Sequence, residues 1–151
     1  MTDLALIQNP DTGKWDLGMT GPDLTTDAGL QTAIVWSLIT DKRATADDIL
    51  PDGSDDRRGN WGDAWPEIDG HQLGSRDWIV LNRAKQTQET LNAAIDSARD
   101  ALQWLIDQGI AANIDVTGEW VRSGLLGRTI TVTRPNGATT TFRYDTVWRA
   151  V

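Results

Sequence analysis

One stretch of the chain constrains the fold more than any other, because its apolar residues recur with the spacing of a helix. Between Thr87 and Gly109 these residues form a single stripe: Leu91, Ile95, Ala98, Leu102, Leu105 and Ile106. Thr87 is a suitable N-cap, and Gly109 suits the position just after a helix end. A helix with one apolar face needs a second layer of structure to cover that face.

The sequence that follows this helix has the alternation and the turns of β-strands. Apolar positions of the first strand are Ile114, Val116 and Trp120. Gly118 predicts a β-bulge in this strand, since an isolated glycine in a strand pattern often marks one. Residues 128–133 and 139–147 predict two more strands, joined by the strong hairpin turn Pro135-Asn136-Gly137.

The first part of the chain predicts a hairpin and a helix. Residues 4–19 contain two short apolar segments around a turn with Pro, Asp and Gly. Thr26 and Asp27 are suitable caps for a helix that runs to about residue 41. This helix is apolar nearly all round, so we expect it to be central or covered on two sides.

Together these elements predict one α+β domain over residues 1–151, built in two layers. Helices pack on a mostly antiparallel or mixed sheet, and residues 1–20 add an N-terminal β-hairpin. A chain of 151 residues can bury most of its apolar surface in one core. It contains no cysteine, so neither disulfides nor thiolate zinc sites contribute to that core.

Residues 42–75 form a long irregular loop, and a loop of this length in a compact domain is often functional. Trp61 and Trp65 lie in it and argue against a simple flexible excursion. Ser75 is a suitable cap for a short helix over residues 76–84, in which we expect Trp78 to be part of the core.

Net charge and tryptophan content bear on the kind of partner. The net charge of −8 argues against binding to nucleic acid or to an anionic membrane. No apolar run approaches the roughly 18 residues that span a bilayer, and the N-terminus lacks the basic region of a signal peptide, which predicts a cytosolic origin. Eight tryptophans favour a protein-binding surface, because tryptophan is enriched at interfaces.

The residues needed for common catalytic and cofactor sites are missing. His71 is the only histidine, and we expect it to be a loop residue. The aspartates of residues 47–63 do not have EF-hand spacing. Asp115 and Glu119 would lie about 13 Å apart on a strand, too far for a glycosidase pair, although Glu67 is free to approach either. We therefore expect no enzyme activity, cofactor, metal or small-molecule substrate.

At Arg57-Arg58-Gly59-Asn60-Trp61-Gly62-Asp63 the chain resembles a family of small baseplate proteins from Mu-like phages and prophages. Asn60 stands where that family usually has an aromatic residue. The resemblance continues through four further segments in the same order: Gly74-Ser75-Arg76-Asp77-Trp78, Arg83, Ala101-Leu102-Gln103-Trp104-Leu105 with Gly109-Ile110-Ala111, and Thr133-Arg134-Pro135-Asn136-Gly137. It therefore covers nearly the whole chain.

This resemblance implies a structural subunit of a contractile phage or prophage tail baseplate, similar to the small wedge protein of contractile tails and related injection machines. It implies assembly in the bacterial host cytoplasm, a place in the virion tail baseplate, and other wedge and tail proteins as partners. The alternative is a lysozyme-like glycoside hydrolase of the tail that acts on peptidoglycan.

Five residues are candidates for the partner interface: Arg57, Arg58, Trp61, Asp63 and Trp104. Arg57, Arg58 and Asp63 either pair with one another and hold the loop, or the arginines reach a partner. We expect Trp61 to pack as an anchor of the loop. Trp104 lies roughly 140° from the apolar stripe, so either another segment of the chain or a partner covers it.

Overall fold

The computed structural model describes residues 3–4, 6–9, 11–20, 23–24, 26–27, 29–66, 69–83 and 85–147. The helices are α1 (Leu30–Ile39), the short 3-10 helix η1 (Trp61–Ala64), α2 (Asp77–Arg83) and α3 (Gln88–Asp107). The strands are β1 (Asp3–Leu4), β2 (Leu6–Gln8), β3 (Trp15–Leu17), β4 (Met19–Thr20), β5 (Asp23–Leu24), β6 (Thr26–Asp27), β7 (Asn113–Arg122), β8 (Leu125–Thr133) and β9 (Thr139–Val147).

The main sheet is antiparallel, with the strand order β7-β8-β9. Its β8–β9 turn is the predicted one: Gly137 has a φ of 85° and donates its N–H to the carbonyl of Arg134. The predicted bulge at Gly118 is wrong, because Gly118 pairs regularly with Arg128 and the irregularity lies between Trp120 and Arg122. Gly118 instead gives α3 room to approach the strand.

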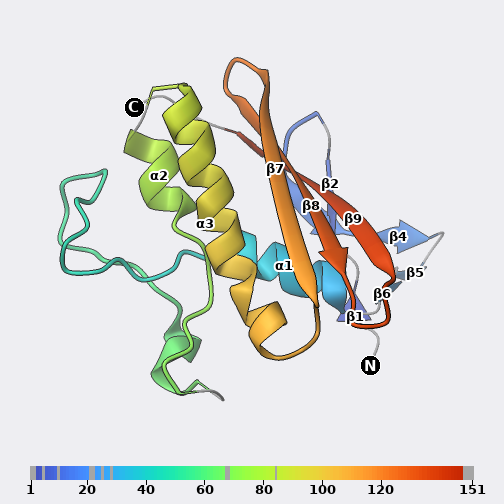
Figure 1. The fold of residues 1–151 in the computed structure, drawn as a ribbon. Coiled ribbons are helices and arrows are strands. Elements are labelled where there is room, and N and C mark those ends of the chain that lie inside the picture. Colours follow the sequence, from blue (N-terminus) through green and yellow to red (C-terminus); the bar gives the residue numbers. More distant parts are fainter. Residues whose placement is uncertain are drawn as a thin grey trace.

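Helix α3 runs alongside β7 and packs against it, so that helices form one layer and the sheet the other (Figure 1). Its ends are as predicted. The Thr87 side chain accepts the N–H of Thr90, and Gly109, with a φ of 71°, follows the helix. The N–H groups of Gly109 and Ile110 return to the carbonyls of Ile106 and Leu105, which satisfies the last turn. The predicted α+β class and layered arrangement are confirmed.

The main core lies between these layers, and it joins α1, α3 and the sheet. Its buried residues are Ile34, Leu38, Ala98, Ala101, Leu102, Leu105, Ala111, Val116, Ile130, Val132 and Tyr144. The predicted stripe of α3 therefore faces the sheet as expected. None of the described helices is long and apolar enough to cross a membrane.

Helix α1 begins later than the sequence predicts. Thr26 and Asp27 form β6, which pairs with β1, so the predicted caps are wrong and Gly29 precedes the helix with a φ of 84°. Pairing with a distant strand outweighs the local capping preference at these two residues. The helix packs against α3 and against the N-terminal strands β2 and β6, which agrees with the expectation that it is covered on more than one side. Its outer side stays open, and Trp36 there is 52% exposed.

The predicted N-terminal hairpin is present as β2 and β3, with Leu6 opposite Leu17. It rests against the outer edge of β9. Gln8 accepts the N–H of Asp145 at 2.9 Å and donates to the carbonyl of the same residue. Trp15 stacks on Tyr144 with ring centroids 5.5 Å apart. The hairpin thus covers part of the edge strand β9, and the stacking of Trp15 on Tyr144 extends the core.

Candidate partner-binding surface

The long loop is closed at its neck, where its two ends bond to each other. Lys42 donates its N–H to the carbonyl of Ser75, and Ser75 donates to the carbonyl of Thr40, both at 2.9 Å. The Ser75 hydroxyl also donates to the carbonyl of Leu38 at 2.8 Å. Gly74 has a φ of 118°, and a Cβ there would lie 2.5 Å from the Thr40 carbonyl. The loop therefore leaves the body from a fixed base.

Arg57 holds the first part of the loop from inside. Its guanidinium donates to the carbonyl of Thr45, and at 3.5 Å to that of Ala46. Its own carbonyl accepts the N–H of Ala44 at 2.9 Å. Arg57 thus satisfies carbonyls of the turn that begins at Thr45, and its charge is directed into the loop.

The carboxylate of Asp48 closes the same turn. It accepts the N–H of Thr45 at 2.7 Å and its hydroxyl at 2.8 Å, and it forms an ion pair with Arg76. Desolvation raises the pKa of Asp48, but the hydrogen bonds from Thr45 and the charges of Arg76 and Arg57 outweigh this and lower it. The carboxylate is therefore held in its ionised form.

Arg58 turns back onto the body of the protein. Its guanidinium lies 2.7 Å from the carboxylate of Asp41 and 4.4 Å from the ring centroid of Trp78. Trp78 is 5% exposed, as predicted for a core residue, and its Nε1–H donates to the carbonyl of Lys42. Arg58 has a φ of 51°, which bends the backbone where its side chain folds inward.

Asp63 fixes the second part of the loop. One carboxylate oxygen accepts the N–H of Leu73 at 3.0 Å, and the other is buried without a hydrogen-bond partner among the described residues. Arg57, Arg58 and Asp63 therefore do not pair with one another, and that alternative is wrong. Each of them ties the loop to a different segment.

Trp61 and Trp65 lie on and just after η1, and both point into solvent. They are 84% and 80% exposed, so the expectation that Trp61 anchors the loop by packing is wrong. The side chain of Asn60 caps η1 by accepting the N–H of Gly62 at 3.1 Å. The loop thus presents two large aromatic side chains on a backbone that is held at several points.

Trp104 is half-buried and contacts α1 and the loop. Its Nε1–H donates to the hydroxyl of Ser37 at 3.0 Å, and the ring of His71 meets it edge-on with centroids 5.9 Å apart. Trp104 also packs against the main core, so the expected separation from it is wrong. Of the two alternatives for what covers Trp104, the structure has other segments of the chain, namely α1 and His71 of the loop. Part of the ring stays open to solvent.

A buried ion pair near the neck of the loop was not predicted from the sequence. Arg128 is fully buried, and its guanidinium lies 2.5 Å and 3.0 Å from the two carboxylate oxygens of Asp77. Desolvation lowers the pKa of Arg128, but the charge and hydrogen bonds of Asp77 outweigh it and raise the pKa. Two signals were available: Arg128 lies on the same strand face as Ile130 and Val132, and Asp77 begins a helix.

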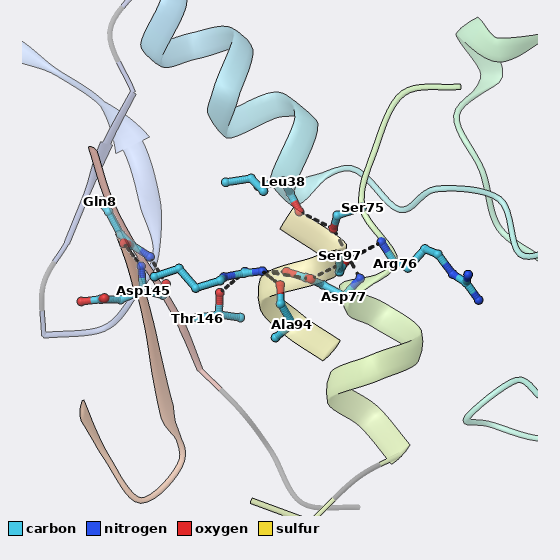
Figure 2. Close-up of polar contacts among 10 residues, drawn as sticks. Gln8, Leu38, Ser75, Arg76, Asp77, Ala94, Ser97, Asp145 and Thr146 are labelled. Atoms are coloured by element: carbon cyan, nitrogen blue, oxygen red, sulfur yellow. Dashed lines mark hydrogen bonds and ion pairs between the residues drawn. The ribbon is translucent and has the colours of Figure 1, made fainter. Parts of the chain in front are cut away.

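The pair belongs to a network that connects the layers, and Figure 2 shows the polar contacts around Asp77. Arg128 also donates to Thr146 of β9 and to the carbonyl of Ala94 in α3. Asp77 accepts from the hydroxyl of Ser97, which in turn accepts the N–H of Arg76. The network therefore ties β8, β9, α2 and α3 together beside the neck of the loop.

The carboxylates considered for catalysis do not assemble into a site in the described part of the chain. Glu119 is 66% exposed at its side chain and lies 3.1 Å from the guanidinium of Arg143. Asp115 is exposed on the same strand, and Glu67 lies outside the described residues. No group of three His, Asp or Glu side chains among the described residues has the geometry to hold a metal ion.

The chain is similar to phage proteins over its whole length. The family described as phage protein GP46 matches residues 30–139, a span that contains the loop, Trp104 and the Arg128–Asp77 pair. The chain is 40% identical over 151 residues to baseplate protein gp46 of Escherichia phage Mu, with 100% of both chains covered. It is 36% identical over 148 residues to the Mu-like prophage FluMu protein gp46 of Haemophilus influenzae, with 98% of both covered.

Proposed function

Because the chain belongs to the phage protein GP46 family, we propose that it is a structural subunit of a phage tail baseplate. The observation that carries this proposal is its 40% identity to a phage Mu baseplate protein along the full length of both chains. A likeness of this extent covers the core as well as the surface, so the same assembly role is the simplest account of it.

We further propose that the chain is a wedge component of a contractile tail, assembled in the bacterial host and placed in the virion baseplate. Its partners are then other wedge and tail proteins, without nucleic acid or membrane. The net charge of −8 supports this choice, because a strongly acidic chain is repelled by the phosphates of both.

The loop around Trp61 and Trp65 is the surface that we propose for partner contacts. Tryptophan side chains dominate many interfaces, because they bury much area at a low cost in conformational entropy. Arg57, Arg58 and Asp63 contribute by holding this loop in place, and a loop already held loses less freedom on binding. Trp104 adds a second, partly exposed contact on α3.

We propose that the subunit is not an enzyme. A lysozyme-like mechanism needs one carboxyl group that stays protonated as a general acid. Glu119, one of the carboxylates considered, is exposed and faces the guanidinium of Arg143. A neighbouring positive charge favours the ionised form of a carboxylate, which is the opposite of what the general acid needs.

Deletion of the gene from the phage or prophage that carries it tests the structural role. We expect tails without complete baseplates in electron micrographs, and normal tails when the gene is supplied in trans. Purified chain incubated with peptidoglycan from pH 4 to 8 should release no soluble fragments. Normal tails without the gene would overturn the proposal, and so would hydrolysis that Glu119→Gln or Glu67→Gln abolishes.

A further inference from the structure

A cavity of about 370 Å³ opens between the start of α1 and the end of α3. It is lined by Gly29, Leu30, Ala33, Trp104, Leu105, Ile110 and Arg134. Most of these side chains are apolar, and they are contributed by two helices and by the segment that follows α3. Ile110 is 43% exposed and Leu105 is 1% exposed, so the cavity runs from the surface to the core.

Arg134 is the one charged side chain of this lining. Its backbone is fixed by the β8–β9 turn, where its N–H donates to Ala138 at 2.8 Å and its carbonyl accepts from Gly137 at 2.9 Å. Its guanidinium has no hydrogen bond or ion pair to any residue in the described part of the chain. By contrast, the guanidiniums of Arg57, Arg58 and Arg128 are all occupied.

An unpaired guanidinium beside an apolar cavity favours an occupant with two features, an apolar side chain and a carboxylate. The apolar walls favour a hydrophobic side chain, because its burial removes apolar area from water. The guanidinium favours a carboxylate, which it can bind with two parallel hydrogen bonds.

We propose that this cavity is a docking site for a segment of another baseplate protein that carries a large apolar residue next to an Asp or Glu. The apolar side chain enters between Ala33 and Ile110, and the carboxylate pairs with Arg134. This inference rests on the proposed baseplate function. A second copy of this chain is disfavoured as the occupant, because two copies with a net charge of −8 repel each other.

Two substitutions test the two parts of the site separately. Arg134→Gln removes the charge and keeps the backbone bonds of the turn, and Ala33→Leu fills the cavity while preserving helix propensity. The probe is the baseplate of the phage that carries the gene, assembled in cells that express each variant as the sole copy. We expect incorporation into purified baseplates to fall about tenfold or more for Arg134→Gln, as the loss of a charge-assisted hydrogen bond implies. We expect a fall for Ala33→Leu as well, because the added side chain takes the space that the docked apolar residue needs.

Matched controls separate docking from folding. Arg122→Gln makes the same change of charge at an exposed residue of β7, and Ala93→Leu makes the same change of size at an exposed residue of α3. Both controls should be incorporated like the wild type, and all four variants should unfold at wild-type temperatures. Wild-type incorporation of Arg134→Gln and Ala33→Leu would overturn the site. A wild-type chain that is absent from baseplates would overturn the proposed function instead.

A photo-crosslinking residue in place of Ile110 identifies what occupies the cavity. In assembled baseplates we expect it to label a different baseplate protein, within a segment that has an Asp or Glu beside an apolar residue. The same crosslinker at Asn136, on the exposed turn, should not label that segment. Labelling of a second copy of this chain, of a segment without a carboxylate, or of nothing would each overturn the proposal.

Discussion

Two arginine-centred regions adjoin the neck of the loop, and they use the same side chain in different ways. Arg128 is fully buried and spans four elements through Asp77, Ala94 and Thr146. Arg57 and Arg58 lie at the surface and hold a single loop to its base. The buried ion pair therefore connects the layers of the fold, whereas the contacts of the two surface arginines set the shape of a loop.

The largest effect should come from Asp77→Ala, which leaves the buried Arg128 without its carboxylate. Removal of one partner of a buried ion pair typically costs about 3 to 5 kcal/mol. We expect a loss of this size in the free energy of unfolding, measured by urea denaturation. The double variant Asp77→Leu with Arg128→Met should recover much of the loss, because it removes both charges. If Asp77→Ala lost less than about 1 kcal/mol, the buried region would contribute no more to stability than the surface region, and the contrast between them would be wrong.

Tyr144 offers a pH test of the same buried region. Desolvation, together with the charge of Asp77, raises its pKa to about 12 against the opposing effect of Arg128. The unfolded pKa is about 10, so the folded protein favours the neutral phenol. The contribution of Tyr144 to the free energy of unfolding is therefore present in full below about pH 10. As the pH rises to about 12, the free energy of unfolding falls by about 2 to 3 kcal/mol.

This loss should appear in the unfolding free energy of the wild type between pH 9 and 12, and it should be absent from that of Tyr144→Phe. Because the chain has a single tyrosine, tyrosinate absorbance reports this side chain directly in the folded protein. A midpoint near pH 10 would show that Tyr144 is solvated and that the core beside Arg128 is open.

Arg58→Ala should cost far less, although it removes both an ion pair and a ring contact. Exposed ion pairs contribute about 0 to 1 kcal/mol, and exposed cation–π contacts about 0.5 to 1. We expect a stability loss of about 1 kcal/mol and faster amide hydrogen exchange confined to the loop. Arg43→Ala, which removes only a bond to the Arg58 carbonyl, is the control. Exchange that rises throughout the core would show that the loop and the fold are one unit.

The sequence predicted the elements whose signals are local. The stripe of α3, its Thr87 cap and its Gly109 end all depend on residues within one helix. Thr26 and Asp27 failed as caps because a distant strand pairs with them. Gly118 failed as a bulge because the room it provides is needed by α3, which the strand alone does not reveal.

The candidate surface was predicted less completely, because side-chain contacts across a loop have no periodicity. The segment from Arg57 to Asp63 was located, but the partners of its charged side chains lie elsewhere: at Asp41, at the Thr45 carbonyl and at the Leu73 N–H. Arg128 was overlooked since an arginine in an alternating strand is read as solvent-facing by default.

The smallest effect on stability should come from Trp61→Ala, and it separates the two regions most sharply. Loss of a buried tryptophan costs about 3 to 5 kcal/mol, whereas surface changes usually stay within about 0.5. Trp78, at 5% exposure, belongs to the first class and Trp61, at 84%, to the second. Urea denaturation of Trp61→Ala and Trp78→Ala should therefore differ by several kcal/mol, while baseplate incorporation should fall for Trp61→Ala although it remains folded. If Trp61→Ala is as unstable as Trp78→Ala, the ring is part of the core and the loop is no binding surface. If Trp61→Ala is as stable as the wild type and is incorporated equally well, the contact surface is instead Trp104 and the cavity beside it.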